Sequence, residues 1–160
     1  PYETFGFNFR ITDLQASLAI ERLKKVSKNI ISVIDLYNRY KNNLNNPNIQ
    51  IIPVEVEKGQ IPLYVEILVK DRNEFISYLD NLSIETRTLY PDIDSAKYLK
   101  TYKDYPNSRT FGDQGLTLPS GPDQSINDIK YVIQKVNEFR PIWSWSQRPF
   151  YLKSYLSITI

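Results

Sequence analysis

The stretch LYVEILVKDRNEFISYL, from Leu63 to Leu79, decides the fold. Its first part, Leu63 to Lys70, is rich in β-branched and aromatic residues and predicts a well-buried strand. Asp71 follows directly and is expected to cap a short helix, Arg72 to Leu79. A strand that leads at once into a helix indicates a small unit that combines strands and helices.

A long helix is expected on the N-terminal side of this strand. Thr12 and Gln15 have the spacing of a capping box, and Asp13 suits the positive end of the helix dipole, so the helix should begin at Asp13. From Leu23 to Leu44 apolar residues recur at alternating spacings of three and four, as in a heptad repeat. We expect a weak point at Ser27–Asn29 and interpret the stripe as a seam against the chain's own domain.

The remaining elements are shorter. Ser125 is expected to cap a last helix, with Asp128 at the third helical position, and Pro141 closes it. We predict a fold of the α/β class, an α+β small domain in which a long N-terminal helix accompanies a small mixed sheet with helices. The other predicted segments are strands at Ile49–Val54, Ser83–Tyr90 and Leu116–Pro119, a turn at Glu57–Gln60 and one helical turn at Ser95–Leu99. The residues expected to be buried together are Leu63, Val65, Ile67, Ile84, Leu118, Ile129 and Ile133.

Composition excludes several classes of function. The 160 residues contain no cysteine and no histidine, which excludes disulfides, thiolate metal sites and a cysteine nucleophile and removes the commonest general base. The net charge of +2 gives no electrostatic case for binding nucleic acid. No apolar run approaches the roughly 18 residues that span a bilayer, no signal peptide is visible, and we expect a cytoplasmic protein. The Lys24, Lys25 and Lys28 cluster is interpreted as a solvated helix face.

Three segments carry a resemblance to a known family. GFNFRITDLQASLAIERLKKV begins at Gly6, DRNEFISYLDNLSIETRTLYPDIDSAKY begins at Asp71, and FGDQGLTLPSGPDQSINDIKYVIQKV begins at Phe111. They resemble, in the same order, three segments of the DegT/DnrJ/StrS family of pyridoxal-phosphate-dependent sugar aminotransferases. The resemblance covers about Gly6 to Phe139, the C-terminal part of such an enzyme.

The resemblance implies a function, which the hydrophobic periodicity alone does not indicate. Members are fold-type-I aminotransferases that move an amino group from an amino acid, usually glutamate, to a nucleotide-linked keto sugar. They work as homodimers with pyridoxal 5'-phosphate as cofactor, and their Schiff-base lysine lies upstream of the G-F-N-F-R motif. The chain is therefore expected to be a C-terminal fragment that is inactive alone and has no catalytic residue of its own.

The resemblance also implies three site residues. Asn8 matches the asparagine that reaches the cofactor phosphate of the neighbouring subunit, where an amide can donate to an anionic oxygen. Arg10 lies two residues on and could bind a carboxylate or phosphate of the substrate. Tyr90 matches a tyrosine near the substrate, although Leu89 stands where members often carry histidine. No metal site is expected.

The sequence predicts two structural units and leaves two alternative functions open. Residues 1–140 are expected to form the small domain with its preceding loop and helix. Residues 141–160 form an aromatic-rich tail with no family counterpart, which we expect to pack rather than to stay in solvent. The alternatives are a non-catalytic binding or assembly module derived from the same domain, and a structural coiled-coil protein built on Leu23 to Leu44.

Overall fold

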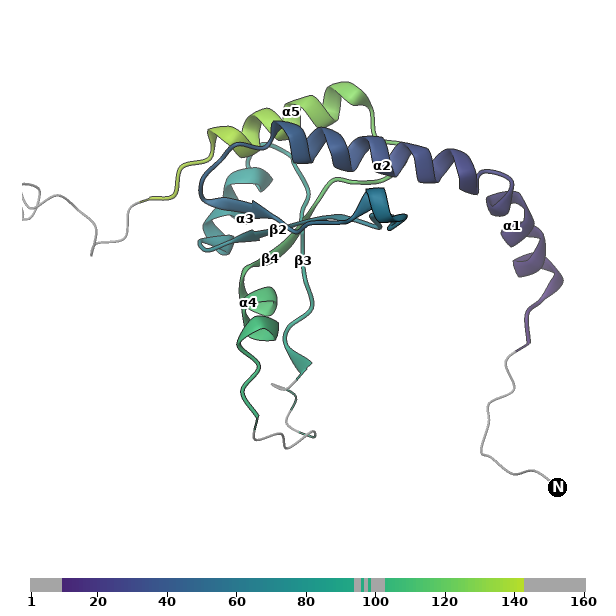
Figure 1. Cartoon of the computed structure of the whole chain (residues 1–160), viewed down its shortest axis with the longest axis horizontal. Coiled ribbons are helices and arrows are strands. Elements are labelled where there is room, and N and C mark those ends of the chain that lie inside the picture. The colour runs from purple at the N-terminus through teal and green to yellow at the C-terminus, as the bar shows by residue number, and fades with distance from the viewer. Residues whose placement is uncertain (1–9, 94–95, 97, 99–102, 143–160) are drawn as a thin grey trace, which may run out of the picture.

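The structure is a computed structural model that describes residues 10–93, 96, 98 and 103–142. Helices α2, α3 and α5 cover one face of a four-stranded sheet, and helix α1 extends away from it (Figure 1). The elements in chain order are α1 (Asp13–Leu23), α2 (Val26–Asn43), β1 (Ile49–Ile51), the 3-10 turn η1 (Val56–Lys58), β2 (Val65–Val69), α3 (Arg72–Asp80), β3 (Arg87–Thr88), α4 (Pro106–Gln114), β4 (Gly115–Leu118) and α5 (Ile126–Glu138).

The structure confirms the predicted fold class, but the strand directions of the sheet differ from the prediction. Its strand order is β1-β2-β4-β3. Each of the three pairings is antiparallel, with Ile51 opposite Ile67, Ile67 opposite Leu116, and Thr88 opposite Leu116. The described sheet is therefore antiparallel rather than mixed. The short strand β1 occupies an edge, which suits Pro53, a residue that lacks the amide a central strand needs.

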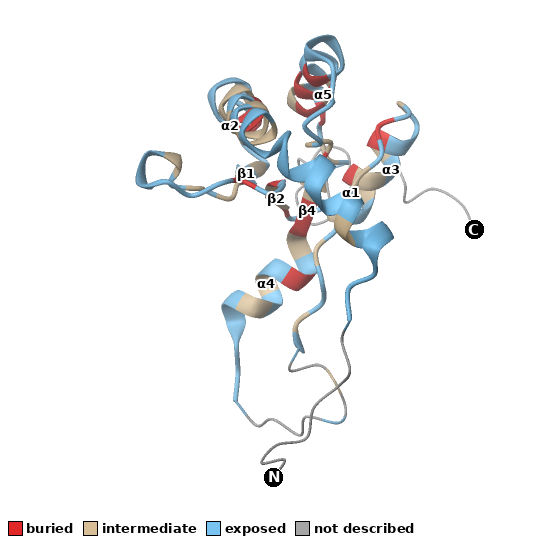
Figure 2. Ribbon diagram, turned by 90° about the vertical axis from the view of Figure 1, so that its right-hand side faces the viewer, coloured by how far each residue is buried: buried red, intermediate tan, exposed pale blue. Residues whose placement is uncertain are grey.

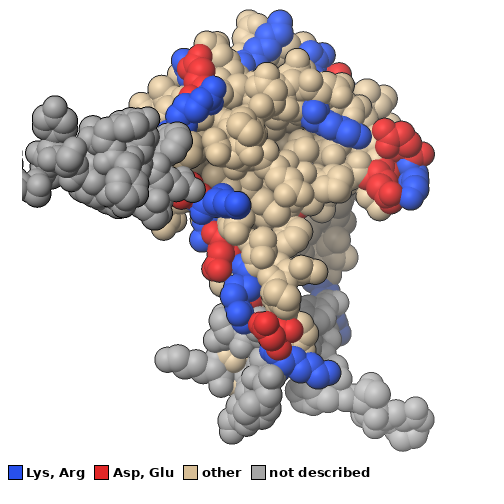
Figure 3. Space-filling model, turned by 60° about the vertical axis from the view of Figure 1, so that its left-hand side comes forward, with Lys and Arg blue, Asp and Glu red and all other residues tan. Residues whose placement is uncertain are grey.

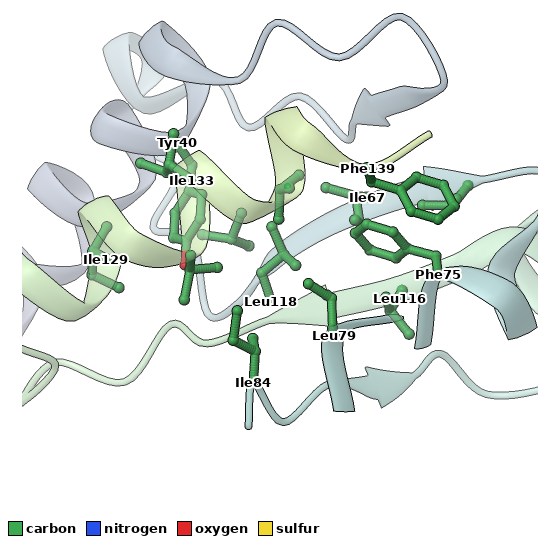
Figure 4. Close-up of a cluster of buried hydrophobic side chains, with 14 of the residues drawn as sticks. Tyr40, Ile67, Phe75, Leu79, Ile84, Leu116, Leu118, Ile129, Ile133 and Phe139 are labelled. Atoms are coloured by element: carbon green, nitrogen blue, oxygen red, sulfur yellow. The ribbon is translucent and has the colours of Figure 1, made fainter. Parts of the chain in front are cut away.

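The core lies between the sheet and its three helices (Figure 4). Along β2, buried residues alternate with partly exposed ones, as expected for a strand with one covered face. Phe75 of α3 meets Phe139 edge to face, with ring centroids 4.8 Å apart. Of the residues predicted to be buried, the ones found in this core are Val65, Ile67, Ile84, Leu118, Ile129 and Ile133.

Leu63 is the error in the predicted core, because its side chain is 78% exposed. The strand begins later than its sequence suggests. Pairing starts at Val65, opposite Leu118, so Leu63 precedes the first residue that the sheet holds in register. Composition marked the apolar run correctly but could not show where pairing with another strand begins.

The N-terminal helix is broken earlier than predicted. The capping box is confirmed, because Thr12 Oγ1 accepts from the Gln15 amide and Gln15 Oε1 accepts from the Thr12 amide. The helix then ends at Leu23 and restarts at Val26, so the break falls at Lys24–Lys25 rather than at Ser27–Asn29.

The apolar stripe is only half buried. Tyr37 and Tyr40 are fully buried in the core of this chain, whereas Leu23 and Val26 are exposed. Figure 2 shows α1 almost wholly exposed, in contrast to the inner sides of α2 and α5. The seam against the chain's own domain is therefore confirmed for the C-terminal half of α2 and is wrong for the part of the stripe nearest α1.

Other predicted segments differ in extent. The strand expected at Ser83–Tyr90 is reduced to Arg87–Thr88, and helix α4 was not predicted. Proline at its first helical position was an available signal, since proline is well suited to that place. The helical turn expected at Ser95–Leu99 includes positions outside the described residues, as does the aromatic part of the tail.

Candidate functional site

The first candidate residue, Arg10, lies just ahead of α1. It is exposed and stands two residues before Thr12, the N-cap. The reciprocal bonds of the capping box, 3.3 Å from the Gln15 amide to Thr12 Oγ1 and 3.0 Å from the Thr12 amide to Gln15 Oε1, fix the direction in which the chain enters the helix. Asn8 lies outside the described residues, so its assignment as a cofactor contact stays a prediction.

The second candidate residue, Tyr90, follows edge strand β3. Its side chain is 93% exposed, although its neighbour Leu89 is held by a backbone bond to Gly115, whose carbonyl accepts from the Leu89 amide at 3.1 Å. Tyr90 is therefore an exposed tyrosine beside a hydrogen-bonded residue and is not part of the core. Its assignment as a substrate contact stays a prediction.

Arg10 and Tyr90, the two candidate residues that the structure describes, lie on separate parts of the fold. In Figure 1, α1 lies at the far end of α2, while the segment that follows β3 leaves from beneath the sheet. Arg10 precedes the former element and Tyr90 belongs to the latter segment. The described part of the chain thus offers separate contacts rather than an enclosed site.

A groove with a volume of about 400 Å³ lies between α2 and α5. Asn137 spans it, because its amide donates to the Asn43 carbonyl at 2.8 Å and its oxygen accepts from the Asn45 amide at 2.9 Å. Its lining includes neither Arg10 nor Tyr90. We interpret it as a helix–helix groove closed by asparagine bonds.

The described residues do not fit a complete pyridoxal phosphate site. The lysines among them are exposed except Lys135, whose side chain is 22% exposed and contacts Glu138 at 2.7 Å. The hydrogen bond to Glu138 raises the pKa of Lys135, which disfavours the neutral amine that a Schiff base requires. Lys135 is therefore held as a charged partner of Glu138.

Charge and metal-ligand patterns add no other site. In Figure 3, Lys and Arg lie next to Asp and Glu around a broad uncharged area, without an extended patch of one sign on the face shown. Within the described ranges no cluster of acidic residues could hold a metal ion. Over the same ranges, none of the helices combines the length and apolarity needed to cross a membrane.

Comparison with known proteins identifies the family. The model of the DegT/DnrJ/EryC1/StrS aminotransferase family matches residues 2–137. GDP-perosamine synthase of Escherichia coli O157:H7 is 28% identical over 145 residues, which cover 86% of this chain and 39% of that protein. The dTDP-3-amino-3,6-dideoxy-alpha-D-galactopyranose transaminase of Aneurinibacillus thermoaerophilus is 26% identical over 139 residues, 84% of this chain and 38% of that protein.

Solved structures show the same fold. DesV of S. venezuelae, crystallised in complex with a ketimine intermediate, superposes with a TM-score of 0.71 at 26% identity, over 92% of this chain and 40% of that one. The sugar aminotransferase CalS13 of Micromonospora echinospora gives a TM-score of 0.74 at 15% identity, over 83% of this chain and 37% of that one, a likeness of fold alone. The chain thus spans about two fifths of the length of the proteins that it matches.

Proposed function

Because the family model matches most of its length, the chain belongs to the DegT/DnrJ/EryC1/StrS aminotransferase family, and we propose that it is the C-terminal part of a pyridoxal-phosphate-dependent sugar aminotransferase. The proposed substrate is a nucleotide-linked keto sugar, which receives an amino group from an amino acid such as glutamate. The observation that carries the proposal is the match over residues 2–137. The proposal extends to a cytoplasmic enzyme that acts as a homodimer.

The exposed helix α1 supports the view that the chain works as one part of a larger enzyme. At 3.6 residues per turn, Leu14 and Leu18 lie on one side of α1, and Leu23 lies roughly opposite to Leu14. These three leucines are 72%, 58% and 66% exposed. A helix that is apolar on opposite sides is suited to burial between two surfaces. We propose that the rest of the enzyme and its dimer partner cover them.

The exposure and pairing of the lysines support the proposal that another segment of the enzyme binds the cofactor covalently. A Schiff base requires a positioned lysine that is partly neutral, and the described lysines are exposed or paired with a carboxylate. In the proposed enzyme the cofactor is held by a segment upstream of this chain. The chain itself contributes binding groups and is inactive alone.

Three residues carry the proposed contacts of the chain. Asn8 would donate to the cofactor phosphate of the neighbouring subunit, and Arg10 would bind an anionic group of the substrate as a fork. Tyr90, exposed after β3, would contact the nucleotide sugar through its hydroxyl group. We assign these residues to a small domain of residues 1–140, and residues 141–160 to a separate tail that packs on another surface.

The test compares this chain with the product of its gene extended upstream of Pro1. Both proteins are incubated with pyridoxal phosphate, dialysed and examined by absorbance, then assayed for transfer of an amino group from glutamate to GDP- and dTDP-linked keto sugars. The longer protein should keep the cofactor and transfer the amino group, and the chain alone should do neither. A stable adduct on one lysine of residues 1–160 would contradict the proposal, as would an upstream reading frame with no cofactor-binding lysine.

The site residues are tested in the longer protein with Tyr90→Phe. Loss of one hydrogen bond should raise KM for the nucleotide sugar about threefold to tenfold, since such a bond contributes about 0.5–1.5 kcal/mol. Tyr98→Phe is the matched control, because Tyr98 is another exposed tyrosine, at 79%, beyond the same strand. Equal kinetics for both variants would remove Tyr90 from the site.

A further inference from the structure

Helix α4 and the segment that carries Tyr90 leave the same end of the sheet (Figure 1). Strand β3 pairs with β4, which begins where α4 ends, so the two segments start from neighbouring strands. The carbonyl of Gly115 joins them, because it accepts from the Leu89 amide at 3.1 Å. The backbone next to Tyr90 is thus tied to the junction between α4 and β4.

Arg72 donates to the same junction from helix α3. Its Nη1 donates to the carbonyl of Gly112 at 2.5 Å and to that of Gly115 at 3.3 Å. Both carbonyls lie at the C-terminal end of α4, where the helix dipole is negative and a cation is favoured. Hydrogen bonds from a charged donor are stronger than neutral ones. Arg72 therefore caps α4 and shares the Gly115 carbonyl with Leu89.

Two glycines bring α4 into backbone contact with both neighbours of Tyr90. A Cβ at Gly112 would lie 2.9 Å from the Asp92 nitrogen and 3.3 Å from the Pro91 Cα. A Cβ at Gly115 would lie 2.5 Å from the Leu89 Cδ1. Both glycines are buried. Leu89 and the Pro91–Asp92 pair therefore dock on α4, and Tyr90 stands between them with its side chain outward.

The anchor of this arrangement belongs to the core. Arg72 is the first residue of α3, the helix whose Phe75 and Leu79 are fully buried. A guanidinium attached there holds α4 at a fixed place relative to the sheet. The contacts run from α3 through the end of α4 to the segment around Tyr90.

We propose that Arg72 is a positioning residue for Tyr90, acting through the C-terminal end of α4 and its glycines. The inference rests on the proposed function in that Tyr90 is taken as a substrate contact. Arg72 touches neither substrate nor cofactor. It fixes the segment from which the tyrosine is presented.

The test measures hydrogen exchange of single backbone amides by NMR on the whole chain. Arg72→Met should speed exchange of the Leu89 amide by at least about tenfold relative to the Ile52 amide, because it releases only the segment tied to α4. The Ile52 amide donates to the Glu66 carbonyl at 2.8 Å beside the opposite edge of the sheet and serves as the internal reference. A purely structural role of Arg72 would speed both amides equally and would contradict the proposal, as would an unchanged Leu89 amide.

Two further variants keep the proposal testable if Arg72→Met does not fold. Arg72→Lys should restore part of the protection, since an ammonium can donate to one of the two carbonyls. Gly112→Ala should speed exchange of the Leu89 amide with Arg72 in place, because the new Cβ displaces the Asp92 backbone and with it the docked segment. Gly121→Ala is its control, since a Cβ there would meet nothing closer than the Gln124 Cγ at 3.9 Å. Equal exchange in the two alanine variants would overturn the proposal.

This experiment needs no substrate, so its outcome is separate from that of the proposed function. If the longer protein fails to transfer amino groups while Leu89 exchange responds to Arg72, the activity is wrong and the positioning stands. If transfer occurs and Leu89 exchange does not respond, the positioning is wrong and the activity stands.

Discussion

Helices α1 and α5 have the same kind of N-terminal cap but differ in burial. In each, a hydroxyl side chain at the N-cap accepts from the amide three residues on, at 3.3 Å for Thr12 and 3.1 Å for Ser125. The helices contain 11 and 13 residues. Yet α1 has no buried residue, while α5 buries Ile129, Val132, Ile133 and Val136. Local signals thus started both helices, and only one of them contributes to the core.

The different burial of α1 and α5 shows that a helix can form without stabilising the domain. An isolated helix of about a dozen residues is marginal in water, because most helical stability in proteins comes from packing of an apolar face. Helix α5 has that packing against the sheet and α2. Helix α1 has apolar residues on opposite sides and no partner among the described residues. The two helices therefore give matched pairs of variants.

The largest difference is expected between Ile129→Ala and Ile20→Ala. Ile129 is 2% exposed on α5, and its truncation should lower the free energy of unfolding by roughly 2–5 kcal/mol, since it leaves a cavity. Ile20 is 54% exposed on α1, and its truncation should change that free energy by less than about 0.5 kcal/mol. Urea unfolding measures both. Equal losses would mean that α1 is packed in solution.

The next effect concerns pH and the packed half of α2. Burial raises the pKa of the Tyr40 hydroxyl above its usual 10.0, and this hydroxyl donates to the Pro119 carbonyl at 2.9 Å. Above that pH the unfolded chain loses the proton and the folded chain keeps it, so the unfolded state is favoured. Above pH 10 the Tyr40 hydroxyl should lower the free energy of unfolding by up to about 1.4 kcal/mol per pH unit. At lower pH this hydroxyl is protonated in both states and should not change that free energy.

Tyr40→Phe is the test of that pH dependence. Partial burial also raises the pKa of Tyr78, so the informative quantity is the difference in slope between variant and parent above pH 10. The variant should show the shallower slope. Ile67→Val is the control, because it is destabilised by roughly 0.5–1.5 kcal/mol and retains the hydroxyl. If Tyr40→Phe and the parent have the same slope, Tyr40 does not titrate as described.

The smallest effect is expected from the two caps. Ser125→Ala should lower the free energy of unfolding by about 1 kcal/mol, because the lost bond starts a helix of the core. Thr12→Ala removes the same kind of bond from α1 and should reduce helicity without moving the unfolding transition of the domain. Circular dichroism at low temperature measures the loss of helicity, and thermal unfolding measures the stability of the domain. A shifted transition for Thr12→Ala would show that α1 is coupled to the core.

The candidate site was predictable only in part. Tyr90 was predicted from a motif, and the structure adds that it is exposed between residues that contact Gly112 and Gly115. The roles of Gly112 and Gly115 were not foreseen, because their contacts with Asp92, Pro91 and Leu89 join positions that are twenty or more residues apart in the chain. Asn8 and Arg10 remain predictions that rest on the family motif alone.

By itself, the sequence determined the features that depend on neighbours within one or two turns. The capping box of α1, the hydroxyl cap of α5 and the starts of both helices belong to this class. Tertiary structure decided the exposure of Leu63 and the half-buried stripe of α2. Each of these depends on which distant surface is present to cover an apolar side chain, and burial is a property of that surface rather than of the residue.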